Sequence, residues 1–244
     1  MAMNPMHQFT VYKIGPEIDL GGVNLSFTNA SLFMIISAIL ILTLLFFGTK
    51  KKSLIPSKIQ LITEQSYTFV AKMINDTAGS NAKAFFPFIF TLFMFVLFCN
   101  MVGMLPYSFT VTSHIIVTFV LAAIVFVGVT VIGFIKHGIK YLELFVPKGV
   151  PAILLPLIVV IEIISYLSRP VSLSVRLFAN MMAGHTMLKV FGGFVISLGL
   201  LGGWLPLSFS VALTGLEILV AFLQAYVFAI LTCIYLNDAL NLHH

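Results

Sequence analysis

The stretch EIISYLSRPVSLSVRLFANMMAGH, from Glu162 to His185, places two arginines inside a long apolar segment. The segment has the composition of a helix buried in a membrane. A charged side chain at that depth costs about 2.5–3.5 kcal/mol on insertion scales. We therefore expect Arg176, in the middle of the segment, to have a function that depends on its charge.

The whole chain has the composition of a polytopic membrane protein. Of its 244 residues, 60% are hydrophobic and only 9% are charged, and the mean hydropathy is +1.10, whereas a water-soluble domain carries about 25% charged residues. The length suffices for five or six spanning helices of about 20 residues each. The net charge of +5 comes from basic residues in short loops, where they set topology, so it does not indicate nucleic-acid binding.

Three apolar runs predict the first three spans: Ser31–Gly48, Phe85–Met104 and Ile115–Ile135. The first and the third are each followed by a cluster of basic residues. Such clusters mark the cytoplasmic side of a bacterial membrane or the matrix side in an organelle. Both clusters give the same orientation, with the N-terminus outside.

The next segment, Ser57–Asp76, follows a different pattern. Ile59, Ile62, Phe69 and other apolar residues fall on one side of a helix, with polar residues between them. This pattern predicts an amphipathic helix that lies in the plane of the membrane at its inner face.

The last two apolar runs, 152–201 and 207–240, are too long for upright spans. The shorter of them would extend about 50 Å, against a hydrocarbon core of about 30 Å. A steep tilt accommodates the excess length. We predict an all-α protein of five crossings in a single domain, 1–244, with a tilted helical hairpin that turns near Gly202, Gly203 and Pro206. The C-terminus then lies inside.

Polar residues form a stripe along the first arm of this hairpin. Glu162, Arg169 and Arg176 are spaced seven apart, which returns each to nearly the same helix face. Pro170 interrupts the backbone hydrogen bonds there and favours a kink. Asn180 falls within about 40° of the same line.

The hairpin also carries groups suited to proton transfer. An imidazole beside a carboxylate forms a pair that titrates near neutral pH, and His185 with Glu217 could form one. On the second arm, Gln224 is seven residues after Glu217 and shares its face. A guanidinium keeps its charge at any accessible pH, so Arg176 would block a proton leak and force a passing carboxylic acid to ionise.

Structural alternatives exist for several of these residues. Glu162 and Arg169 could form a buried ion pair, or Arg169 could extend to the inner interface. Gln224 could have the purely structural role of bridging two helices. For Arg176 no acid on the adjacent turns offers a structural partner. His185 and Glu217 alone do not complete a metal site.

Motifs of soluble enzymes, such as the zinc His-Glu-x-x-His and the Gly-x-Ser-x-Gly elbow, are missing from the sequence. We therefore expect a non-catalytic protein without a cofactor. Two other classes fit a membrane protein with one buried arginine: a secondary transporter for an anion and a membrane-protein insertase. The first should show inverted repeats, and the second leaves Glu217, His185 and Gln224 without a role.

The run RPVSLSVRLFANMMAGH, at 169–185, resembles subunit a of the F-type ATP synthases, together with Glu162 before it and Glu217, Gln224 and LNDALNLH after it. The similarity extends to PMHQF at 5–9, to FCNMVGMLPYSFT at 98–110 and to TSHI at 112–115. Members from alphaproteobacteria, which are close to the mitochondrially encoded ones, are the most similar in type.

The resemblance implies a role for each site residue. Arg176 matches the essential arginine that faces the rotating ring of c subunits, Glu162 the acid of the inner half-channel, and Arg169 the basic residue before the proline. Four residues match the half-channel open to the outside: Asn180, His185, Glu217 and Gln224. In many bacterial members the acid and the imidazole occupy each other's positions.

The resemblance also implies the surroundings of the protein. Its partners would be the c-ring, the b subunits of the peripheral stalk and the lipid bilayer, and its cargo would be protons. ATP chemistry would take place in other subunits. The expected location is the bacterial inner membrane, with the mitochondrial inner membrane as the alternative.

Overall fold

A computed structural model describes residues 8–14, 19–20, 23–24, 26–50, 55–105, 108–146 and 154–241. Five helices in these ranges are long and apolar enough to cross a membrane. They include α1 (Asn29–Lys50), α3 (Phe86–Gly103) and α4 (Ile115–His137). The number of crossings agrees with the prediction. The lysines at 51, 52 and 148, which contributed to the predicted orientation, lie outside the described residues.

Short elements connect the helices. Three 3₁₀ segments, η2 (Ser80–Phe85), η3 (Val111–Ser113) and η4 (Gly138–Phe145), precede or follow α3 and α4. Two strands of two residues each, β1 (Asp19–Leu20) and β2 (Val23–Asn24), pair in antiparallel register before α1. The sequence pattern did not predict this small hairpin.

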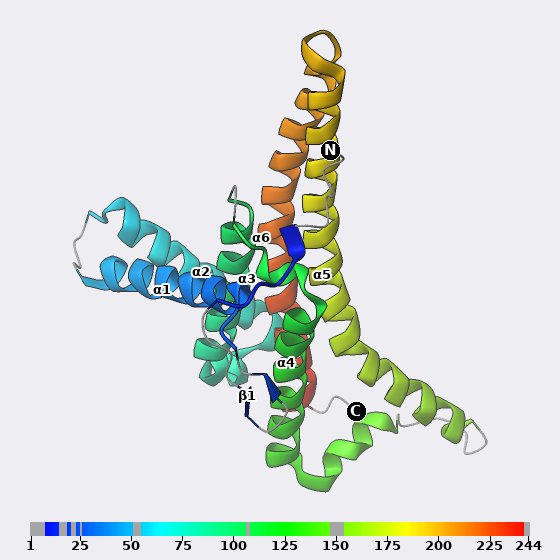
Figure 1. Ribbon diagram of the computed structural model, residues 1–244. Coiled ribbons are helices and arrows are strands. Elements are labelled where there is room, and N and C mark those ends of the chain that lie inside the picture. Colours follow the sequence, from blue (N-terminus) through cyan, green and yellow to red (C-terminus); the bar gives the residue numbers. More distant parts are fainter. Residues whose placement is uncertain are drawn as a thin grey trace.

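The predicted amphipathic helix is α2 (Lys58–Ala78). It begins where the Ser57 hydroxyl accepts a hydrogen bond from the Gln60 backbone amide, at 3.3 Å, an N-cap. The helix runs beside α1 (Figure 1). Val70 and Met73 are buried, whereas Ile59, on the same predicted face, is exposed. Its placement in the plane of the membrane stays a prediction.

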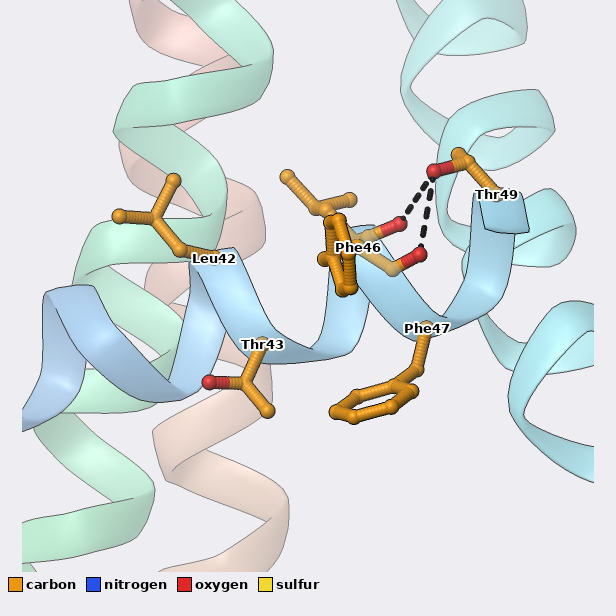
Figure 2. Close-up of a pocket in the computed structure, with 6 residues that line it drawn as sticks. Leu42, Thr43, Phe46, Phe47 and Thr49 are labelled. Carbon is orange, nitrogen blue, oxygen red and sulfur yellow. Dashed lines mark hydrogen bonds between the residues drawn. The ribbon is translucent and has the colours of Figure 1, made fainter.

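The outer surface of α1 is suited to a lipid environment. Leu42, Phe46 and Phe47 project from it (Figure 2) and are each more than half exposed. Thr49 does not need water, because its hydroxyl donates to the carbonyls of Leu45 and Phe46 in its own helix. A polar group in lipid must be satisfied within the protein in this way.

The hairpin consists of α5 (Leu155–Gly202) and α6 (Trp204–Leu240), two long helices that lie side by side (Figure 1). The chain reverses direction between Gly199 and Gly203, and Gly199 has φ of 60°, a left-handed conformation that favours glycine. In Figure 1, α5 bends in the yellow-green half that carries Pro170. Proline lacks the backbone N–H, so a bend there has a clear cause.

The main core lies where α2, α3, α4, α5 and α6 cross. Phe228 of α6 is fully buried against apolar residues of the other helices. Cys99 and Cys233 are buried free thiols, in accordance with a packing role. The core includes Leu173 and Leu177 of α5 and the C-terminal half of α6, whereas the arms near the turn extend beyond it (Figure 1).

Candidate functional site

The antiparallel arrangement of α5 and α6 brings His185 and Glu217 together, although they are 32 positions apart in the chain. The imidazole Nδ1 lies 3.4 Å from the Glu217 Oε1 atom. The side chains are only 11% and 5% exposed. The two groups are therefore within reach of a proton transfer once a hydrogen bond closes between them.

Close contact of the two helices at this point depends on Gly184. A Cβ atom at Gly184 would lie 2.8 Å from Oε1 of Glu217 and 3.1 Å from its Cδ. Real Cβ atoms do not approach an oxygen so closely. The missing side chain of Gly184 thus makes room for the carboxylate, as small residues do where membrane helices meet.

A second contact between the two helices lies further from the turn of the hairpin. The Asn180 amide donates to the Oε1 atom of Gln224, at 2.9 Å. From α3, the Asn100 amide donates to the backbone carbonyl of Ala221, at 3.2 Å. Asn100 is fully buried, and sequence analysis did not select it, since a lone Asn in an apolar span gives no periodic signal.

Arg176 differs from Arg169, His185 and Glu217, which all lie close to a charged or ionisable partner. Its side chain is exposed, and it makes no hydrogen bond or ion pair to any other residue in the described part of the chain. The guanidinium is therefore available to a group outside this polypeptide. The prediction that no acid of its own chain neutralises Arg176 agrees with this geometry.

Arg169 is paired, with a residue that sequence analysis missed. Its Nη1 atom donates to Oδ2 of Asp238 on α6, at 3.2 Å. The alternative of an ion pair with Glu162 is wrong for the described residues, because seven residues separate the two along the axis by about 10 Å. Asp238 follows Glu217 by three steps of seven, and this spacing was the available signal.

Glu162 is half-buried near the start of α5 and has no ion-pair partner among the residues that the structure describes. It does not join the His185–Glu217 contact, which lies beyond Arg176 along α5, towards the turn of the hairpin. The site residues therefore divide into two groups along the hairpin, with Arg176 between them. We name the groups after the predicted orientation. The outer group, towards the turn, consists of Asn180, His185, Glu217 and Gln224, with Asn100 beside it, and the inner group consists of Glu162, Arg169 and Asp238.

A cavity of about 740 Å³ reaches the outer group. His185 and Lys189 line one side of it, and the N-terminal segment, the start of α1 and the chain after α3 line the remainder. Two other cavities of similar size in the described part of the chain have no site residue in their walls. The cavity at His185 gives the imidazole a connection to the surface.

Several buried polar atoms of the outer group have no hydrogen-bond partner among the described residues. These atoms are Nε2 of His185, both carboxylate oxygens of Glu217, Nε2 of Gln224 and Oδ1 of Asn100. Leaving one such atom unpaired costs about 1–3 kcal/mol. A water-accessible path past these side chains would relieve that cost, whereas a dry interior would not.

The chain is similar to known proteins over its full length. A family model described as ATP synthase A chain matches residues 31–237. A protein named ATP synthase subunit a from Pelagibacter ubique (strain HTCC1062) is 80% identical, with all of both chains covered. Proteins of the same name from Rhizobium rhizogenes and Chelativorans sp. (strain BNC1) are 61% and 59% identical, with at least 98% of each chain covered.

Proposed function

Because the chain belongs to the ATP synthase A chain family, the proton-translocating stator subunits of F-type ATP synthases, we propose that its α5–α6 hairpin serves two offset half-channels. The observation that carries the proposal is the division of the site: His185 and Glu217 meet beside a cavity, Glu162 lies at the other end, and Arg176 is unpaired between them.

The outer half-channel begins at the cavity and continues past His185 and Glu217. A proton from outside passes between the imidazole and the carboxylate, and it then moves along the Asn180–Gln224 contact towards the exposed face of the hairpin. Water from the cavity supplies partners for the unpaired atoms of this group. The proton ends on a carboxylate of the neighbouring c-ring.

The ring carries the proton to the inner half-channel. Once protonated, the ring carboxylate is neutral and can turn through lipid without the cost of a buried charge. After nearly a full rotation it reaches the inner side near Glu162 and releases the proton. Each charge that crosses the membrane potential supplies about 2.3 kcal/mol per 100 mV, which drives rotation.

Arg176 separates the two paths. Its fixed positive charge favours the ionised form of a ring carboxylate that comes close to it. The carboxylate therefore releases its proton before it passes Arg176. Protons also cannot cross directly from one half-channel to the other past a guanidinium. This role requires an arginine without a partner in its own chain, and Arg176 has the exposed side chain, unpaired among the described residues, that fits it.

The remaining assignments follow from the family. The subunit is non-catalytic, its neighbours are the c-ring and the b subunits of the peripheral stalk, and it needs no cofactor. It lies in the bacterial inner membrane, or in a mitochondrial inner membrane, with the N-terminus outside and the C-terminus inside. The basic residues at the end of α4, Lys136 and His137, support this orientation.

The test is replacement of Arg176 in the assembled complex. Arg176→Ala should abolish ATP synthesis driven by a proton gradient while the subunit remains in the membrane in normal amount. Lys72→Ala is the matched control, because Lys72 is an exposed cation on α2, a helix that is not part of the hairpin. Synthesis by Arg176→Ala at the rate of the control would overturn the proposal.

A further inference from the structure

Arg169 is held more firmly than a surface ion pair requires. Besides its hydrogen bond to Asp238, its guanidinium carbon lies 5.3 Å from the ring centre of Tyr166 and 5.0 Å from that of Tyr235. One ring comes from α5 and the other from α6. The cation therefore touches an aromatic ring of each helix as well as an acid of α6, and each cation–π contact adds to the attraction.

Tyr166 links this contact to the rest of the protein. Tyr166 is 8% exposed, and its hydroxyl is hydrogen-bonded to Thr130 of α4, at 2.6 Å, and to the hydroxyl of Tyr141 in η4, at 3.0 Å. The surface on which Arg169 lies is thus fixed by two other elements. A connected set of side chains joins α4, η4, α5 and α6 at the inner end of the hairpin.

The backbone of α5 lacks one of its hydrogen bonds at this place. Pro170 has no N–H, so the carbonyl of Tyr166 lacks its usual helical partner. A bend at this point would change the direction in which Arg176, two turns further on, projects. The cross-helix contacts of Arg169 lie one residue from the proline and limit such a change.

We propose that Arg169 is a positioning residue for Arg176: held between Tyr166 and Tyr235, it pairs with Asp238 and so keeps the Asp238 carboxylate away from Arg176. This proposal rests on the proposed function, since it assigns Arg176 the role described above.

The charge balance gives the pairing its importance. Arg169 and Arg176 lie on the same face of α5, about two turns apart, and Asp238 is on the helix opposite. If Arg169 were neutral, the Asp238 carboxylate would have no cationic partner. Arg176 would then be the arginine nearest to that carboxylate on this face of α5. An Arg176 drawn towards Asp238 could not serve a ring carboxylate.

Paired substitutions test the proposal in the assembled complex. The readouts are ATP-driven proton pumping and passive proton leak in inside-out membrane vesicles, each divided by the amount of assembled complex. The variants are Arg169→Gln, Asp238→Asn, the double variant and Arg169→Lys. Lys140→Gln is the control, since Lys140 is an exposed cation near the same end of the protein.

We expect Arg169→Gln to reduce pumping per complex about threefold to tenfold, because removing one member of a partly buried pair leaves the other charge unpaired. The double variant should recover to within about twofold of the control, since replacing both members is often neutral. Arg169→Lys keeps the charge but loses the planar fork, and its pumping should fall between the two.

The double variant separates positioning from simple packing. If Arg169 only filled space between the tyrosines, the double variant would remain as slow as Arg169→Gln, and that result would overturn the proposal. Pumping by Arg169→Gln at the control rate would overturn it as well. Either failure leaves the proposed function intact if Arg176→Ala is inactive, whereas an active Arg176→Ala refutes the proposed function itself.

Discussion

Gly184→Ala should separate the stability of the subunit from its transport function. The new methyl group would lie 2.8 Å from the Glu217 Oε1 atom and 3.1 Å from Cδ. An ordinary contact requires about 3.4 Å or more, so the carboxylate must shift by at least several tenths of an ångström. That shift changes the 3.4 Å separation between Glu217 and His185.

The effect on folding should be small because two contributions oppose each other. The carboxylate is the far end of a flexible side chain, and forcing it away from its preferred rotamer costs about 0.5–1.5 kcal/mol. Alanine in place of glycine inside a helix returns about 1 kcal/mol. The assembled amount of complex should therefore stay close to normal.

Transport should respond far more strongly. Misplacing a reacting group by about 1 Å costs as much as a hundredfold in rate, so a displacement of several tenths of an ångström should slow proton pumping about tenfold. The assay is pumping in vesicles per assembled complex. Gly192→Ala is the matched control, because it lies on the same helix and a Cβ atom added there would meet no atom within 4 Å. If both variants pump equally well, the close contact at Gly184 has no part in proton transfer.

Three further changes address the outer group. Exchanging His185 and Glu217 should preserve more transport than Glu217→Ala, since one imidazole and one carboxylate remain; equal loss in ATP-driven pumping would contradict a shared relay. Asn180→Leu leaves the Gln224 amide oxygen without its donor, so a loss of about 1–3 kcal/mol in unfolding free energy is expected by thermal denaturation of the complex; an unchanged melting temperature would show that the bond contributes nothing. Asn100→Leu should lower pumping severalfold at normal assembly if its unpaired amide oxygen contacts water in the half-channel, and unchanged pumping would place that atom outside the path.

The fold followed from the sequence to the extent that it depends on hydrophobic length. The runs that became α1, α3 and α4 have the length of a single span, and the tilted hairpin was required by two runs that exceed it. The contact of α2 with the membrane stays a prediction. Its apolar side divides between Ile59 and Ile62, which are exposed, and Val70 and Met73, which are buried against other helices. Periodicity shows that a helix is amphipathic, but it does not show which neighbour covers each apolar residue.

The site was predictable where its residues lie on one helix face and less so where two helices meet. The spacing of seven placed Arg169 and Arg176 on one face of α5, but it could not show that Asp238 lies opposite Arg169. That pairing depends on the register of the antiparallel hairpin, which is set by the turn at Gly203 and by packing across the core. Sequence spacing within one helix carries no information about that register.

The two ends of the hairpin differ in how their charged and ionisable groups are paired. At the inner end Arg169 and Asp238 satisfy each other, since they are joined and Arg169 is flanked by aromatic rings. At the outer end His185 and Glu217 lie close together, yet both carboxylate oxygens and one ring nitrogen lack a hydrogen-bond donor or acceptor among the described residues. A satisfied pair holds its protons and its geometry, whereas an unsatisfied pair beside a cavity can exchange protons with water. In the proposed mechanism, α5 therefore has a fixed end that orients Arg176 and a labile end that exchanges protons, and the exposed guanidinium of Arg176 lies between them.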